Sequence, residues 1–123
     1  MNSKVTMALR IVLGLILIIF GANKFAWFMP SPELSEAAGN FMGALKNTGY
    51  MFPLIGAVEV FVGLLLIFKK WVPFALVLFA PIAVNILAYH IKLDMANIVP
   101  GLIVSVLTVV LIYFNWNHYK SLF

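Results

Sequence analysis

Long apolar runs dominate the pattern of hydrophobic and polar positions along the chain. Four of them extend over about 5–22, 50–68, 71–91 and 98–114, and each holds at most one Asp, Glu, Lys, Arg or His. A helix needs about 20 residues to cross a hydrocarbon layer of ~30 Å. The runs are continuous, whereas the strands of a spanning β-barrel would alternate. The pattern therefore predicts an all-α integral membrane protein, a four-helix bundle forming a single transmembrane domain over residues 1–123.

A shorter, amphipathic pattern occupies the connection between the first two runs. Ser31 and Pro32 suit the N-cap and the first position of a helix. Apolar residues then recur at helical spacing as far as Leu45, with charged and polar residues between them. This predicts a short external amphipathic helix at about 32–47 that lies on the membrane surface or caps the bundle. It is either a packed lid or a docking site for a partner.

Composition and charge agree with a protein that is dissolved in a lipid bilayer. Of the 123 residues, 64% are hydrophobic and 10% are charged, and the net charge is +4; soluble domains have about a quarter of charged residues. The basic excess is too small and too scattered to indicate nucleic acid. Its distribution instead predicts a multi-pass protein with both termini in the cytoplasm. That side would hold Lys4, Arg10, Lys69, Lys70 and Lys120, and the other would hold Lys24, Lys46 and Lys92.

Small and polar residues gather on one face of each apolar run. Small residues allow helices to approach closely in lipid, so we expect the glycines on these faces to be packing positions. They are Gly14, Gly21, Gly56, Gly63 and Gly101. The four faces are Arg10–Gly14–Leu17–Gly21–Lys24, Phe52–Gly56–Glu59–Gly63, Pro81–Asn85–Tyr89–Lys92 and Gly101–Ser105–Thr108–Ile112.

Glu59 is the charged residue in the middle of the second run. Ionisable residues at this depth are costly and usually face the interior of a bundle. Counted at 1.5 Å per residue, Arg10 lies within about 7 Å of Glu59 along the membrane normal. We therefore expect a buried Arg10–Glu59 pair, with Asn85 adding hydrogen bonds. Such a pair is either structural only or part of a proton-handling or quinone site.

Other types of site find little support in the sequence. His90 ends the third run, where it is either an interfacial residue or a group that passes protons, and His118 lies at the opposite side. With two distant histidines and no cysteine, no metal site is expected. The chain also has no catalytic triad, P-loop or dinucleotide motif. It is not expected to be an enzyme on its own.

Three segments of the chain together resemble the DoxX family of small four-helix membrane proteins. They are RIVLGLILIIFGANKF in the first helix, GAVEVFVGLLLIF in the second and AYHIKLD at the end of the third. The family pattern would be carried by Arg10, Gly14, Gly21, Lys24, Glu59, Gly63 and His90. The resemblance implies a protein of the bacterial inner (plasma) membrane. Some relatives are membrane subunits of thiosulfate:quinone oxidoreductase, and others look like anchors of redox assemblies.

Three functions follow from these observations. The first is a redox-associated, quinone-linked subunit that binds a quinone-like or small acidic ligand around Arg10, Glu59 and Asn85, with Lys24 and His90 as further candidates. Lacking cysteine and any covalent cofactor, it would need quinone or a redox partner protein to carry electrons. The second is a proton-coupled transporter working as a dimer, so that an oligomer is an open alternative. The third is a structural anchor of a membrane complex.

Overall fold

The computed structural model describes residues 3–29 and 33–122, and the structured elements in these ranges are all helical. Four long helices account for the four apolar runs. They are α1 (Ser3–Ala26), α3 (Met51–Ile67), α4 (Val72–Leu93) and α5 (Ile98–Phe114), with the short helix α2 (Glu36–Asn47) between α1 and α3. Three single 3-10 turns follow α4 and α5: η1 (Met95–Asn97), η2 (Trp116–His118) and η3 (Lys120–Leu122). The predicted helical membrane bundle is confirmed.

The helices differ in how far they could cross a bilayer. By length and composition α1, α4 and the segment Met95–Phe114 are long and apolar enough to span. Helix α3 has 17 residues, the lower limit for a spanning helix. It is long and apolar enough to span only when it is counted together with α2, from which it is bent by 87°. Within the described residues, three helices are thus long and apolar enough to span, or four if α2 and α3 together form one span.

Helix α2 begins later than the sequence pattern predicts. Residues 33–35 are not helical, and Ser35 is the N-cap, its hydroxyl accepting from the Ala38 amide at 3.2 Å. A serine followed by Glu36 in the first turn is a favourable start for a helix. The predicted start at Ser31 and Pro32 lies outside the described residues. At the other end of α2, Gly49 turns the chain towards α3 with a φ of 78°.

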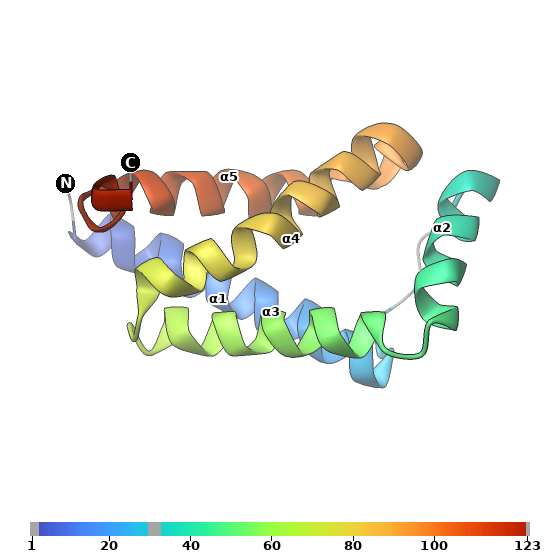
Figure 1. The fold of residues 1–123 in the computed structure, drawn as a ribbon, viewed down its shortest axis with the longest axis horizontal. Helices are drawn as coiled ribbons and strands as arrows, with labels where there is room; N and C mark the ends of the chain where they lie inside the picture. The colour runs from blue at the N-terminus through green and yellow to red at the C-terminus, as the bar shows by residue number, and fades with distance from the viewer. Residues whose placement is uncertain (1–2, 30–32, 123) are drawn as a thin grey trace.

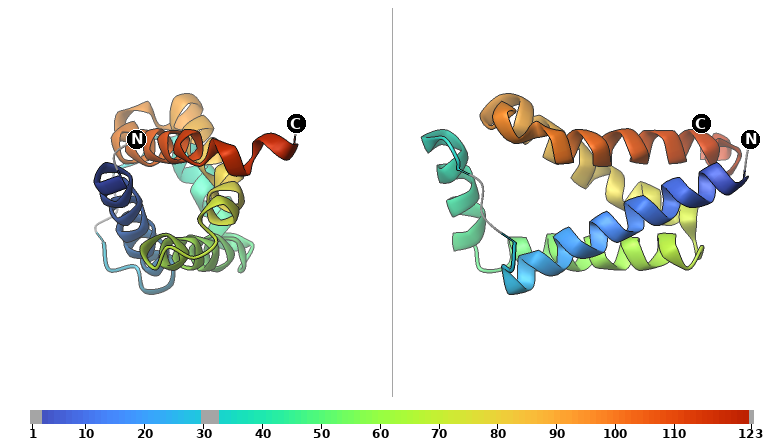
Figure 2. Two further views of the ribbon diagram at one scale, coloured as in Figure 1. Left: turned by 90° about the vertical axis from the view of Figure 1, so that its left-hand side faces the viewer. Right: turned by 180° about the vertical axis from the view of Figure 1, so that it is seen from behind.

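The four long helices form two antiparallel pairs that diverge from each other. In Figure 1, α1 and α3 lie together below and α4 and α5 lie together above. The pairs approach each other at the end of the bundle that holds Ser3, the α3–α4 turn and Leu122, which we call the terminal end. They separate towards the opposite end, which α2 crosses and which we call the lid end; the reverse view in Figure 2 shows the same divergence of α1 from α5.

Glycines explain why the two helices of each pair lie close together. A Cβ added at Gly21 would lie 2.7 Å from the Gly56 carbonyl oxygen, and one added at Gly63 would lie 2.7 Å from the Gly14 carbonyl oxygen. The backbones of α1 and α3 are therefore in direct contact. In the other pair, a Cβ at Gly101 of α5 would meet side chains of α4 at 2.9 and 3.0 Å. All five predicted packing glycines lie at contacts between the two helices of one pair. The two pairs contact each other through larger side chains.

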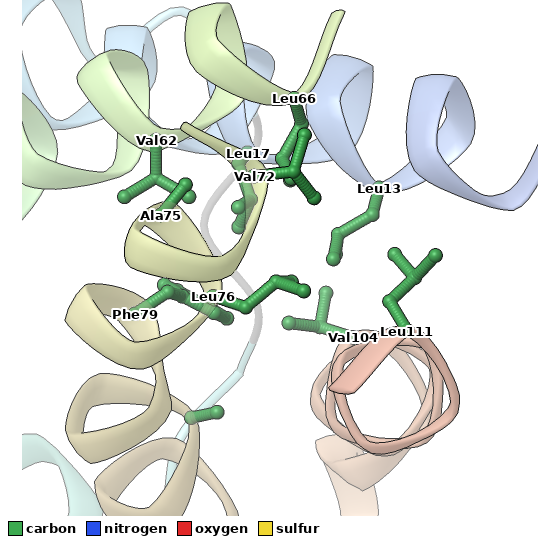
Figure 3. Packing of buried hydrophobic residues seen from close by; sticks show 11 residues of the cluster. Leu13, Leu17, Val62, Leu66, Val72, Ala75, Leu76, Phe79, Val104 and Leu111 are labelled. Atoms are coloured by element: carbon green, nitrogen blue, oxygen red, sulfur yellow. The ribbon is translucent and has the colours of Figure 1, made fainter. Parts of the chain in front are cut away.

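The hydrophobic core lies between the two pairs, mostly towards the terminal end, and Figure 3 shows how its side chains pack. Its fully buried members come from all four long helices, and Phe79 is the largest of them. Burial of apolar side chains at this end holds the two pairs together where they approach. The core consists of Leu13, Leu17, Val62, Leu66, Val72, Ala75, Leu76, Phe79, Ala83, Val104 and Leu111.

The C-terminal segment is fixed to the α3–α4 turn. The Tyr119 hydroxyl donates a hydrogen bond of 2.6 Å to the Pro73 carbonyl oxygen. Burial raises the pKa of this hydroxyl to about 12. The bond closes the terminal end by joining the last described residues to the start of α4.

Candidate functional site

A cavity of about 670 Å³ lies in the lid half of the molecule, where the two helix pairs diverge. This volume is in the range of small-molecule sites. Most of its wall is apolar and comes from all five helices. The polar and charged residues along it are Lys24, Glu59, Asn85, Tyr89, His90 and Lys92.

Helix α2 forms the end wall of the cavity. Phe41, Met42 and Leu45 line it, and the Phe41 ring stacks on Tyr89 of α4 with centroids 5.3 Å apart. The apolar face of the amphipathic helix is thus directed towards the interior. This arrangement agrees with the lid interpretation of the 32–47 segment.

The cavity also reaches the side of the bundle. Asn85 and Ala88 of α4 line it and are at the same time exposed, and Ile55 of α3 lines it from the opposite side. Figure 1 shows that α3 and α4 diverge towards the lid end. In a bilayer the opening would face lipid.

Glu59 forms the charged centre of the cavity with Lys24. The Lys24 Nζ lies 2.6 Å from the Glu59 Oε1, and the two side chains are 20% and 3% exposed. Lys24 Nζ also donates to the Phe20 carbonyl oxygen at 3.4 Å. A carboxylate at this depth requires a partner, and the last turn of α1 supplies it.

The predicted Arg10–Glu59 pair is wrong. The Arg10 guanidinium instead donates to the carbonyl oxygens of Leu66 and Ile67, the latter at 3.2 Å. These carbonyls lie at the C-terminus of α3, where backbone acceptors lack helical partners and a cation is favoured. Arg10 is buried, as its place on the glycine face predicts, but it stabilises a helix end rather than a carboxylate.

Helix geometry explains this difference. In the register set by Gly14 against Gly63, Arg10 lies level with Ile67, which is eight residues or about 12 Å from Glu59. Side chains in a helix lean towards its N-terminus. Because α1 and α3 are antiparallel, that lean carries Arg10 away from Glu59 and carries Lys24 towards it. Depth counted from the ends of the apolar runs gives neither the register between α1 and α3 nor the direction in which each side chain leans.

Asn85 does not supply hydrogen bonds to the charged pair either. Its amide donates to the Pro81 carbonyl oxygen of its own helix at 2.8 Å, and the residue is exposed. The predicted Pro81–Asn85–Tyr89–Lys92 face of α4 is therefore only partly interior, since Tyr89 is buried whereas Pro81 and Lys92 are exposed. The helix buries Ala75, Leu76, Phe79 and Ala83 instead.

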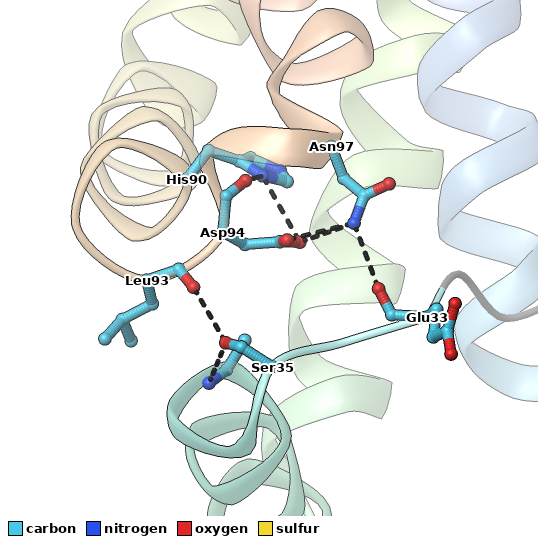
Figure 4. Close-up of polar contacts among 7 residues, drawn as sticks. Glu33, Ser35, His90, Leu93, Asp94 and Asn97 are labelled. Carbon is cyan, nitrogen blue, oxygen red and sulfur yellow. Dashed lines mark hydrogen bonds and ion pairs between the residues drawn. The ribbon is translucent and has the colours of Figure 1, made fainter.

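A polar cluster joins the lid to the α4–α5 connection, as Figure 4 shows. The Ser35 hydroxyl donates to the Leu93 carbonyl oxygen at 3.2 Å, and the Asn97 amide donates to the Glu33 carbonyl oxygen at 3.4 Å. The same amide reaches both oxygens of the buried Asp94, at 2.9 and 3.1 Å. These bonds fix the start of α2 over the cavity.

His90 belongs to both the cavity and this cluster. It lines the cavity, and its Nδ1 lies 3.2 Å from the Asp94 carbonyl oxygen and 3.7 Å from a carboxylate oxygen of Asp94. Its ring packs beside Gly101 of α5. His90 is thus placed between the lid and the cavity.

Tyr89 is a cavity residue that the sequence pattern placed on a polar face without assigning it a role. Its hydroxyl is buried and has no hydrogen-bond partner at ordinary distance among the described residues, but the Asp94 carboxylate is close enough to attract its proton. The sequence signal for a role of Tyr89 in the cavity is its position one turn after Asn85, at the level of the amphipathic segment. The hydroxyl remains a donor for a molecule in the cavity.

Comparison with known proteins gives one match. No curated protein and no solved structure matches the chain. The family model described as DoxX matches residues 5–91, which include α2, α3 and most of α1 and α4. That segment contains the glycine contacts between α1 and α3, the Lys24–Glu59 pair and α2, and it makes up well over half of the sequence. The chain belongs to the DoxX family.

Proposed function

We propose that this DoxX membrane protein is the quinone-binding membrane subunit of a redox assembly. The observation that carries the proposal is the cavity between the helix pairs, with an apolar wall, a side opening beside α4 and one buried ion pair. A quinone is a flat ring with two carbonyl oxygens and an apolar tail. An apolar cavity with few polar groups is the usual form of such a site.

The polar residues of the cavity fit this ligand. The Lys24 ammonium and the Tyr89 hydroxyl are two donors that line the cavity and could each bind a carbonyl oxygen. Glu59 holds the ammonium in place and is a carboxylate that can accept a proton. A bound quinone would supply two-electron redox chemistry, and a partner protein would exchange the electrons, because the chain has no cysteine.

The apolar part of the ligand would extend from the side opening into lipid. Asn85, Ala88 and Ile55 line that opening. A ligand dissolved in the membrane could enter there without displacing α2, whose start is bonded to Leu93 and Asn97.

We also propose that both termini lie on the cytoplasmic side of the plasma membrane. The terminal end carries five lysines and arginines and the lid end carries three, a bias of the kind that orients multi-pass proteins. Fusion of a reporter enzyme after Phe123, active only in the cytoplasm, tests this orientation; activity of a periplasmic reporter there would reverse it.

Tryptophan fluorescence can test the quinone site, because the three tryptophans lie at different ends of the bundle. Trp27 packs edge-on against Phe52, with ring centroids 5.4 Å apart, and Phe52 lines the cavity. Trp71 and Trp116 lie at the terminal end. The experiment uses two single-tryptophan proteins in lipid nanodiscs, one retaining Trp27 and one retaining Trp71, titrated with a short-chain ubiquinone.

We expect saturable quenching of Trp27 and only linear, collisional quenching of Trp71. Lys24→Met and Tyr89→Phe should each weaken the saturable phase, the first about tenfold because a charge-assisted hydrogen bond is lost. Arg10→Met is the matched control, since Arg10 bonds the end of α3 away from the cavity. Equal, non-saturable quenching of both tryptophans would refute the proposal.

The two other functions suggested by the sequence stay predictions. A proton-coupled transporter would need Glu59 to be reached from the terminal end as well, where the hydrophobic core is packed. Uptake driven by a pH gradient in liposomes, abolished by Glu59→Gln, would establish it. An anchoring role would be seen as a larger complex that survives purification from native membranes and is lost when the outer face of α2 is altered.

A further inference from the structure

The terminal end of the bundle gathers positive charge from three separate parts of the chain. Arg10 of α1 bonds the carbonyl oxygens of Leu66 and Ile67, and Lys69 and Lys70 follow directly in the α3–α4 turn. The C-terminal segment joins them through the Tyr119 hydrogen bond to Pro73, and it carries Lys120. Lys4 lies in the first turn of α1.

Among the described residues, Lys69, Lys70 and Lys120 form no ion pair with an acidic side chain. The four acidic residues of the chain are Glu33, Glu36, Glu59 and Asp94. Glu59 is buried against Lys24, and the other three belong to the lid and to the α4–α5 connection at the opposite end. The terminal end therefore has five basic residues and no acidic residue, whereas the exposed lysines of the lid end, Lys46 and Lys92, have acidic residues on the same end.

The α3–α4 turn presents its charges and an aromatic ring outwards. Lys69, Lys70 and Trp71 are all exposed, and the Trp71 side chain is among the most exposed aromatic groups, at 69%. Lys69 and Trp71 have φ values of 55° and 52°. This left-handed conformation is unfavourable for residues other than glycine, yet the turn adopts it twice in three residues.

We propose that the terminal end is a binding site for the headgroups of anionic phospholipids. Trp71 would lie at the level of the headgroups, as tryptophans at membrane interfaces do, with Lys69 and Lys70 beside it to bind phosphate groups. Clusters of Lys and Arg next to a membrane-spanning helix attract anionic lipids with about 1 kcal/mol per residue. The proposal does not depend on the quinone site, because it concerns the opposite end and other residues.

The test compares the lipids next to Trp71 with those next to Trp27. Two single-tryptophan proteins are reconstituted in vesicles of phosphatidylcholine and phosphatidylglycerol, with bromine on the chains of one lipid or the other. Bromine quenches only nearby tryptophans, so the ratio of quenching gives the preference for anionic lipid at each end. We expect a preference of several-fold at Trp71 and none at Trp27.

Charge removal then identifies the residues. Lys69→Gln with Lys70→Gln should abolish most of the preference, since these are the exposed lysines next to Trp71. Lys46→Gln with Lys92→Gln removes the same charge from the lid end and should leave the Trp71 preference unchanged. The preference should also fall towards unity in 1 M salt, where the screening length is about 3 Å.

Three results would overturn the proposal. The first is the same lipid preference at Trp71 and Trp27, and the second is the same effect of the two lysine pairs. The third is loss of the preference in inorganic phosphate when sodium chloride of equal ionic strength preserves it, because the site would then bind soluble phosphate. Retention of the preference in phosphate supports a lipid headgroup site.

Discussion

The contact between Gly21 and Gly56 allows a quantitative prediction for Gly21→Ala. The new Cβ would lie 2.7 Å from the Gly56 carbonyl oxygen and 2.8 Å from Val60 Cγ2, whereas ordinary contacts begin near 3.4 Å. Helices α1 and α3 must therefore separate locally by about 0.7 Å, because a backbone oxygen cannot rotate away. Overpacking of this kind costs about 1–3 kcal/mol.

A matched control removes the effect of helix propensity. Replacing glycine with alanine inside a helix stabilises it by about 1 kcal/mol where space is available. Gly39 in α2 has that space, since no atom lies within 4 Å of its added Cβ. The difference between Gly21→Ala and Gly39→Ala in free energy of unfolding should thus be about 1–3 kcal/mol, with Gly21→Ala the less stable.

Unfolding in mixed micelles of a mild detergent and increasing sodium dodecyl sulfate, followed by circular dichroism, measures this difference. Gly101→Ala should fall between the two, because its Cβ would meet the side chains of Ile86 and His90, which can shift. If Gly21→Ala is as stable as Gly39→Ala, then the backbones of α1 and α3 are not in contact and the register used to explain Lys24 is incorrect.

Three further predictions concern single contacts. In a double-mutant cycle, Lys24→Met and Glu59→Gln should show a coupling of about 1–3 kcal/mol in free energy of unfolding; additive losses would disprove the ion pair. Arg10→Met should destabilise by about 1.5–3 kcal/mol through its lost charge-assisted hydrogen bonds, whereas quinone quenching should stay unchanged. Tyr119→Phe should cost about 0.5–1.5 kcal/mol. Because the pKa of Tyr119 is raised to about 12, its contribution is complete below pH 10 and lost as the pH rises through 12; absorbance of tyrosinate at high pH follows this ionisation.

The sequence predicts the helices well because hydrophobic length is a local property. The run at 98–114 coincides with α5 (Ile98–Phe114). The faces of α1 and α3 are also predicted, since their glycines and charged residues share the helical period. The partner of Glu59 is not, because it depends on the register between two helices and on the lean of each side chain.

A ligand site around Glu59 and Asn85 is expected from the sequence, and both residues line the cavity, but the shape of the cavity could not be predicted. It exists because the two helix pairs diverge, and the angle between pairs is set by the whole core, from Leu13 and Leu111 to Phe79. The periodicity of one helix contains no information on that angle. The hydrogen bonds expected from Asn85 to the charged pair are therefore absent, since Asn85 lies at the exposed edge of the cavity and bonds to its own helix.

The pairing of α1 with α3 also bears on how the chain enters the membrane. Lys24 and Glu59 both belong to this first helical hairpin, so the two ionisable groups can bond to each other before α4 and α5 are synthesised. Each would cost roughly 2.5–3.5 kcal/mol if it entered the bilayer centre alone. A hairpin inserted as a unit bears less of that cost, and the second hairpin contains no carboxylate or lysine between Val72 and Ile91. Biogenesis could therefore proceed as two successive hairpin insertions, with the charged pair buried in the first.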